Sequence, residues 1–435
     1  MKKYTAFSLI LFTFFITYIF WLFETPSKQV STYRQYSQFI ASISLVALTW
    51  INYISTRHSL IDTLFNGLDK SYIYHKYISV ISIILIWIHT QTLKIGGFSG
   101  KDRMKGAVPP EGFTEPSNPN FFNFLFSGKQ LGSISMYSFI ALVIFFIIAA
   151  KLEYEKWKIL HKLLLIPYAF GIAHYYLSSD YNVFSFTAYS LWMNIINISG
   201  LWFAIYSIFI YEMIAFKYSY TITDIREVAK DTLEITGISK DKSMKYKPGQ
   251  FAFMKVINKK GLFPSHPFTM SQAFKDDEIQ FTIKSLGDHT ENLRNNLVIG
   301  DRIAVSGPFG KFNYEAESKH QVWIAGGIGI TPFRAFWQKG ISKDFTIDLF
   351  YAYNNQEEGA YIDELKSLNQ NSNFKIHLYD SSISGFLSAE EIEKYLNRND
   401  EYDFYFCGPT VMRKKIEKGL DKSIFKIKEF HYEYF

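Results

Sequence analysis

Four histidines in the first half of the chain lie within stretches that are otherwise mostly apolar. His75 and His89 are 14 residues apart in one stretch, and His161 and His174 are 13 residues apart in another. An ionisable side chain inside a membrane helix is costly in free energy, so it usually marks a functional site. Histidine is also a common ligand of metal ions and of haem iron. The four residues therefore predict metal ligation within a membrane.

The spacing of the histidines predicts two sites at different depths. Separations of 14 and 13 residues correspond to about 21 and 19.5 Å along a helix, and the hydrocarbon core is about 30 Å thick. The two helices should run in the same direction, so that His75 pairs with His161 and His89 pairs with His174. We interpret the pairs as axial ligands of two haems. A polar cavity with hydrogen-bonded histidines, or a proton path, is the alternative.

Helical geometry sets a condition on the second helix. Fourteen residues bring a side chain back to within about 40° of its starting direction, whereas thirteen leave it about 140° away. The helix that carries His161 and His174 must therefore bend or over-wind. Pro167 lies between these histidines and can cause the distortion, because it removes a backbone donor.

Apolar stretches predict the helices that position these residues. A helix needs about 20 residues to cross the hydrocarbon core. We expect six transmembrane helices, and we interpret the first as retained, since it lacks a clear signal-peptide cleavage site. The stretches are 4–23, 35–56, 77–93, 130–150, 163–179 and 181–211.

Charge is distributed unevenly between the halves. Residues 1–216 contain 16 Lys and Arg but 10 Asp and Glu, whereas residues 217–435 contain 30 of each kind. A basic excess beside membrane helices orients them, and here it favours a cytoplasmic second half rather than nucleic-acid binding. Cys407 is the only cysteine, which excludes an internal disulfide and a cysteine-ligated iron–sulfur cluster.

The second half has the pattern of two soluble domains. Short alternating strands from 217 to 316 predict an antiparallel barrel. From 317 a buried strand leads into a turn with Gly326, Gly327 and Gly329, which predicts a parallel α/β nucleotide-binding domain. Such a turn lets the backbone approach a pyrophosphate, although an ordinary tight turn has the same composition.

Five motifs then occur in a fixed order: HPFTMS (266–271), IKSLGDHT (283–290), GPFG (307–310), AGGIGITP (325–332) and CGP (407–409). Together with the histidine spacing, they resemble the NADPH oxidase and ferric reductase superfamily, and most closely the prokaryotic NADPH oxidases. The resemblance implies a six-helix di-haem domain at 1–216, an FAD-binding β-barrel at 217–316 and an NAD(P)-binding α/β domain at 317–435.

The resemblance also implies the flavin site. Thr269 would lie beside the isoalloxazine ring. The N-terminus of a helix would hold the FAD pyrophosphate. The residues implied are His266, Pro267, Phe268, Thr269 and Ser271 at the flavin, and Gly287, Asp288, His289 and Thr290 at the pyrophosphate.

The nicotinamide site follows by the same resemblance. Cys407 would border the nicotinamide ring, and Phe435 would stack on the flavin and act as a gate. Asn354 and Asn355 follow the second strand, where relatives often carry an arginine that contacts the 2′-phosphate of NADPH. Either NADH or NADPH is therefore a candidate cofactor. The other implied residues are Gly326, Gly327, Gly329, Thr331 and Pro332 at the pyrophosphate, and Gly408 and Pro409 beside Cys407.

The expected function is electron transfer from cytoplasmic NAD(P)H through FAD and two b haems to an acceptor across a bacterial inner membrane. Oxygen, giving superoxide, is the first candidate acceptor. A ferric chelate or a periplasmic partner protein is the alternative, and the loop 94–129 should cover the outer haem and influence the choice. The sequence is also compatible with a homo-oligomer. We expect His58 at a membrane interface, and His320, His377 and His431 at the surface.

Overall fold

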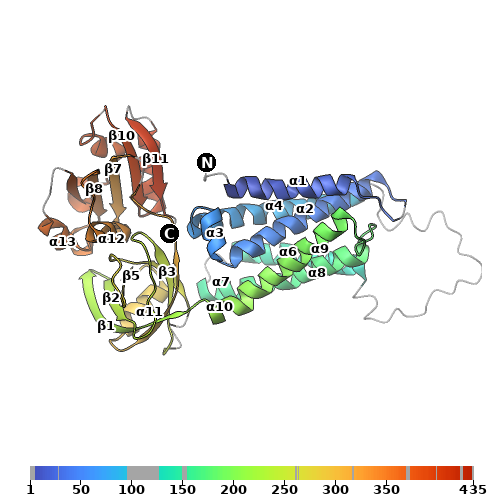
Figure 1. Cartoon of the computed structure of the whole chain (residues 1–435), viewed down its shortest axis with the longest axis horizontal. Coiled ribbons are helices and arrows are strands. Elements are labelled where there is room, and N and C mark those ends of the chain that lie inside the picture. Colours follow the sequence, from blue (N-terminus) through green and yellow to red (C-terminus); the bar gives the residue numbers. More distant parts are fainter. Residues whose placement is uncertain are drawn as a thin grey trace, which may run out of the picture. The chain divides into compact units, whose positions relative to one another are not determined.

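The computed structural model describes residues 5–27, 29–95, 127–148, 154–259, 262, 264–315, 318–368, 373–397, 399–421 and 425–433. The chain divides into two compact units (Figure 1). One contains Met1–Phe65 and Ser71–Glu212, and the other contains Asn66–Lys70 and Met213–Phe435. The loop 94–129 lies almost entirely outside the described residues, as does Phe435.

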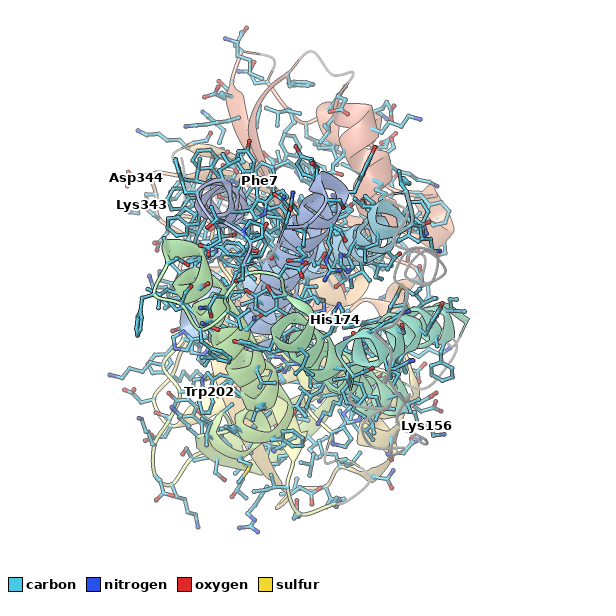
Figure 2. The ribbon with its side chains drawn as sticks, turned by 90° about the vertical axis from the view of Figure 1, so that its right-hand side faces the viewer. Phe7, Lys156, His174, Trp202, Lys343 and Asp344 are labelled. Atoms are coloured by element: carbon cyan, nitrogen blue, oxygen red, sulfur yellow. The ribbon has the colours of Figure 1, made fainter. Side chains whose placement is uncertain are left out.

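The first unit is a bundle of apolar helices. Five helices among the described residues are long and apolar enough to cross a membrane. Large side chains such as Phe7 and Trp202, which Figure 2 labels, are about half exposed, as expected of a surface that faces lipid. These helices are α1 Thr5–Leu22, α2 Thr32–Ser55, α4 Leu68–Ile95, α6 Gly128–Ile148 and α9 Ala188–Ile205, the last continuing through a π-turn, Tyr206–Ile210, into α10 Tyr211–Ile214.

The remaining apolar stretch forms a composite helix. It consists of α7 Tyr154–His161, a 3₁₀ turn η4 Lys162–Leu164 and α8 Leu165–Ser178. A short helix, α3 Ser59–Leu64, precedes α4 and was not expected from the sequence. The stretch 181–211 was predicted to begin too early, because Thr187 caps α9 and residues 181–187 are not helical.

Small residues let the helices approach closely. Along α6 and α8, Ser135 Oγ donates to the Pro167 carbonyl oxygen at 2.7 Å. On α9, a Cβ added to Gly200 would lie 2.4 Å from Thr49 Oγ1 of α2. The bundle is therefore held by close backbone contacts and buried hydroxyl groups.

The second unit begins with a six-stranded antiparallel sheet. Its strands are ordered β4-β3-β6-β1-β2-β5. Met270, directly after β4, bridges to Phe281 of β5, so the two edges of the sheet meet as a barrel. The elements are β1 Tyr218–Ala229, β2 Thr232–Ile238, β3 Phe251–Val256, β4 His266–Thr269, β5 Glu278–Lys284, α11 Asp288–Asn296 and β6 Arg302–Phe309.

A five-stranded parallel sheet follows, with the order β11-β10-β7-β8-β9. Alternate residues of β7 pack into different cores: Trp323 lies with α12 and α13, and Ile324 with α15 and α16. Helices thus cover both faces, as parallel sheets require. The elements are β7 His320–Gly326, η7 Gly327–Ile330, α12 Thr331–Lys339, β8 Thr346–Tyr353, η8 Gln356–Glu358, α13 Ile362–Ser367, β9 Phe374–Asp380, α14 Ser381–Ser384, α15 Ala389–Glu393, β10 Glu401–Cys407, α16 Thr410–Leu420 and β11 Lys426–Tyr432.

Candidate cofactor sites

The bundle brings the four histidines together in the predicted pairs. The ring centroids of His75 and His161 are 6.4 Å apart, and those of His89 and His174 are 6.2 Å apart. Two histidines that ligate one metal ion from opposite sides, with metal–nitrogen bonds of about 2.0–2.1 Å, have centroids about 6 Å apart. Both separations therefore suit one metal ion between each pair.

The helix that carries His161 and His174 is over-wound where the spacing required it. The 3₁₀ turn Lys162–Leu164 follows His161 directly and precedes Pro167. A 3₁₀ turn rotates each residue by about 120° rather than 100°, which reduces the misalignment of the two histidines. The local distortion lets both rings face α4.

The rings of the His89 and His174 pair are oriented by backbone carbonyl groups. His89 Nδ1 lies 2.8 Å from the Ser37 carbonyl oxygen, and His174 Nδ1 lies 2.7 Å from the Gly128 carbonyl oxygen. Because a carbonyl group only accepts, each Nδ1 carries the proton and leaves Nε2 free as a ligand. Ser37 Oγ also lies 2.8 Å from His89 Nδ1 and donates to the His89 carbonyl oxygen at 2.9 Å.

The His75 and His161 pair has aromatic surroundings instead. Trp157 stacks on His161 with the centroids 4.7 Å apart, and Phe146 lies 5.2 Å from the same ring. The Nδ1 atoms of His75 and His161 are buried and make no hydrogen bond of normal geometry with any described residue.

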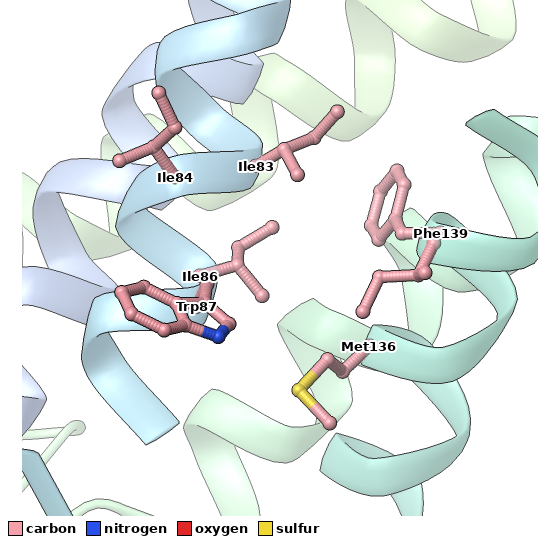
Figure 3. Close-up of a pocket in the computed structure, with 7 residues that line it drawn as sticks. Ile83, Ile84, Ile86, Trp87, Met136 and Phe139 are labelled. Atoms are coloured by element: carbon pink, nitrogen blue, oxygen red, sulfur yellow. The ribbon is translucent and has the colours of Figure 1, made fainter. Parts of the chain in front are cut away.

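The space between α4 and α6 is apolar. Figure 3 shows Ile83 and Ile86 of α4 facing Met136 and Phe139 of α6 across a cavity of about 240 Å³. These α4 residues lie between His75 and His89 in the sequence. Only 11% of the most apolar segment of α4 is buried, against 50% of that of α2. An apolar space at this level of α4, between its two histidines, is compatible with a haem, whose faces are largely apolar. Among the described residues no three His, Cys, Asp or Glu form a metal-binding group.

The predicted flavin residues meet at the barrel. His266 of β4 and His289 of α11 stack with ring centroids 3.7 Å apart. The hydroxyl oxygens of Thr269 and Ser271 are buried without a hydrogen-bond partner in the described part of the chain. Buried hydroxyl groups are normally satisfied, so these two fit a bound cofactor.

A threonine hydroxyl group caps the start of α11. Thr290 Oγ1 accepts hydrogen bonds from Leu286 N at 2.9 Å and Gly287 N at 3.1 Å. Burial and the neighbouring His266 lower the pKa of His289 to about 4. The stack therefore contains a neutral His289 near pH 7 in the free protein.

The two nucleotide motifs of the parallel sheet also meet. A Cβ added to Gly329 would lie 2.1 Å from the Cys407 carbonyl oxygen, and the Cα of Gly326 is 2.9 Å from the Cβ position of Gly408. Strand order reverses between β7 and β10, and ligands of open α/β sheets bind at such a point. Thr331 and Pro332 begin α12 there, so its N-terminus faces the same crevice.

Two buried groups of this region bear on its chemistry, and only the second was not considered from the sequence. Cys407 is fully buried, and burial raises the pKa of its thiol well above the usual range. Glu433 is also buried, its carboxylate oxygens have no hydrogen-bond partner among the described residues, and burial raises its pKa. The single acidic residue in the aromatic segment HYEYF was the available signal for Glu433.

The other histidines differ partly from expectation. His58 caps α3 by accepting a hydrogen bond from Leu60 N at 3.2 Å. The surface prediction was wrong for His377, which bonds Asp348 Oδ1 at 2.8 Å, and for His431, which stacks on Tyr405 at 4.5 Å. Both rings cover aromatic core residues, so they are only partly exposed. His320 is more exposed.

Three families match the chain in series. A ferric reductase like transmembrane component matches residues 39–173, an FAD-binding domain matches 217–325, and an oxidoreductase NAD-binding domain matches 323–418. Together they indicate the superfamily of ferric reductase-like membrane proteins. The combination of a membrane domain with an FAD/NAD oxidoreductase module supports NAD(P)H-driven electron transfer.

Curated relatives are similar to about half of the chain. Flavohemoprotein B of Dictyostelium discoideum is 27% identical over 220 residues, which cover 44% of this chain and 52% of that protein. The toluate 1,2-dioxygenase electron transfer component of Pseudomonas putida is 24% identical over 230 residues, covering 50% of this chain and 67% of the relative. The chain thus spans about half to two thirds of these two proteins.

Two solved structures also align with about half of the chain. The FAD/NAD-binding domain of nitric oxide dioxygenase from Vibrio cholerae aligns with a TM-score of 0.44 and 22% identity, covering 50% of this chain and 98% of that one. Phthalate dioxygenase reductase aligns with a TM-score of 0.41 and 18% identity, covering 49% and 67%.

Proposed function

We propose that the chain is a transmembrane flavocytochrome b that carries electrons from NAD(P)H, through FAD and two b haems, to an acceptor across the membrane. The observation that carries the proposal is the matched separation of the two histidine pairs, 6.4 and 6.2 Å, within an apolar bundle. When bound, FAD accepts the two electrons of a hydride and releases them singly to haem iron.

In this proposal, the Nε2 atoms of two histidines would hold each haem iron. His75 and His161 would hold the inner haem, which receives electrons from FAD, and His89 and His174 would hold the outer haem, which faces the acceptor. With two histidines on each iron, oxygen would not bind the iron directly. The acceptor would therefore be reduced at the haem edge.

The soluble module would orient the nucleotides. The N-terminus of α11 and the hydroxyl group of Thr269 would hold FAD, and the turn Gly326–Gly329 would hold the nicotinamide cofactor's pyrophosphate. Cys407, Gly408 and Pro409 would border the nicotinamide. Because burial raises the pKa of Cys407, its thiol stays protonated near pH 7 and contributes no charge.

We propose oxygen as the acceptor, which gives superoxide, with the soluble module on the cytoplasmic side of a bacterial inner membrane. A ferric chelate is the second candidate acceptor, because the family that matches residues 39–173 is ferric reductase like. A periplasmic partner protein would instead receive the electrons if neither small acceptor is reduced.

An acceptor assay on the purified protein tests these proposals. With NADH or NADPH as donor, reduction of cytochrome c should be inhibited by superoxide dismutase if oxygen is the acceptor. Reduction of ferric citrate under argon at a higher rate than superoxide formation in air would instead favour a ferric reductase.

A further inference from the structure

The two histidine pairs differ in what their second ring nitrogen contacts. In the pair His89 and His174, both Nδ1 atoms lie at hydrogen-bonding distance from a backbone carbonyl oxygen, at 2.8 and 2.7 Å. In the pair His75 and His161, neither Nδ1 makes a hydrogen bond of normal geometry with a described residue. The backbone of Ile51 lies near the His75 ring but does not meet that geometry.

This difference has a chemical consequence. An Nδ1–H group that donates to a carbonyl oxygen shifts electron density into the ring and makes Nε2 a more basic ligand. A more basic axial ligand stabilises ferric over ferrous iron and lowers the midpoint potential. The carbonyl oxygens carry partial negative charge, so their electrostatic effect also lowers the midpoint potential.

Resting on the proposed function, we infer that the haem held by His89 and His174 has the lower midpoint potential of the two. An electron would then reside preferentially at His75 and His161. The site at His89 and His174, which we propose to face the acceptor, would be the stronger one-electron reductant. Ser37 and Gly128 act as positioning residues because their carbonyl groups set the ring tautomers.

Gly132 of α6 provides a way to perturb one pair. A Cβ at this position would lie 2.6–2.9 Å from three atoms of the His174 ring, including Nδ1. In the Gly132→Ala variant the His174 ring must move, and its hydrogen bond to the Gly128 carbonyl oxygen must lengthen or break. Gly171→Ala is the matched control in the same pair of helices, because its Cβ would meet Ser135 Oγ at 3.2 Å and no histidine.

The experiment is a spectroelectrochemical titration of the purified, haem-loaded protein without nicotinamide. We expect two one-electron components in the wild type. Gly132→Ala should shift the lower component to a more positive potential, or remove it with its haem, and leave the higher one in place. Gly171→Ala should shift neither. Ser37→Ala, which removes an Oγ that lies 2.8 Å from His89 Nδ1 and donates to the His89 carbonyl oxygen, should shift the lower component by a smaller amount, because the Ser37 carbonyl group remains.

Single-haem variants assign the components independently. His75→Leu should retain the lower potential, and His89→Leu should retain the higher one. Two components of equal potential in the wild type, or a shift of the higher component in Gly132→Ala, would overturn the inference while leaving the haem assignment intact. Purified protein without haem would refute the proposed function itself.

Discussion

The candidate site in the bundle depends on four side chains from two helices, whereas the candidate sites in the soluble module depend largely on backbone at the ends of strands. The bundle needs imidazole nitrogens at fixed separations, so removing a side chain should abolish ligation. The soluble module needs the absence of side chains, as at Gly329, where an added Cβ would clash with Cys407. The two regions should therefore be damaged by opposite kinds of substitution.

The largest effect is expected from loss of a ligand. His75→Leu, His89→Leu, His161→Leu or His174→Leu should each lower Soret absorbance per protein by roughly half and abolish reduction of the final acceptor, because each iron needs two axial nitrogens. Pyridine haemochrome analysis measures the haem content. His58→Leu is the control, since His58 only caps α3 and should leave haem content unchanged. Full haem content in all four variants would contradict the assignment.

Adding a side chain in the soluble module should damage its nucleotide site and leave the histidine pairs of the bundle intact. Gly329→Ala adds a Cβ that would lie 2.1 Å from the Cys407 carbonyl oxygen, so the two turns must separate. We expect flavin reduction by NAD(P)H to fall by at least about tenfold, which corresponds to about 1.4 kcal/mol in the barrier. Haem content and reduction by dithionite should remain normal. A loss of haem in this variant would mean that the two sites are not separable in this way.

A buried charge network offers a test of stability within the soluble module. Arg334 of α12 bonds Glu234 Oε2 at 2.9 Å and Gln280 Oε1 at 2.5 Å in the barrel, and Glu364 Oε2 at 2.8 Å. Arg334→Met would remove one of the two arginines that pair with buried Glu234, whereas Arg226 and the Tyr361 hydroxyl group would still bond it. A buried charge left with no partner costs about 3–5 kcal/mol, so we expect a loss near the lower end of that range. Denaturant unfolding followed by flavin fluorescence measures the change.

Arg294→Met is the matched control for that substitution. Arg294 pairs with Glu227 and Asp231 on the exposed surface of the barrel. Exposed ion pairs contribute less than about 1 kcal/mol. Equal destabilisation by the two substitutions would show that the Arg334 network is not the stronger link between barrel and α/β domain.

The smallest effect concerns pH. Burial and His266 lower the pKa of His289 from 6.5 to about 4, so the stack contributes stability above pH 6.5 that is lost as the pH falls toward 4. Partial exposure limits the effect to about 1 kcal/mol. His289→Phe should keep the stacking and flatten the pH dependence of unfolding between pH 7.5 and 5, whereas His320→Phe should not. The idea fails if both variants retain the wild-type slope.

The sequence predicted the histidine pairs because their spacing, depth and helix direction leave little freedom, and it predicted the distortion near Pro167 from the angle alone. It predicted the order of the soluble domains because their glycine turns occur as motifs. It did not predict Ser37 and Gly128, since a backbone carbonyl leaves no mark in residue type. Glu433 and the stacking of His266 on His289 depend on tertiary contacts between distant segments. The gate proposed for Phe435 stays a prediction.

The central claim is that electrons from NAD(P)H reach haem in the bundle. Anaerobic stopped-flow spectroscopy of the purified protein, with flavin and haem bands recorded together, tests it most directly. After addition of NADH or NADPH, we expect the flavin absorbance to fall and the Soret and α bands of reduced b haem to follow. The claim is contradicted if the flavin is reduced while the haem stays oxidised for minutes, although dithionite reduces it at once.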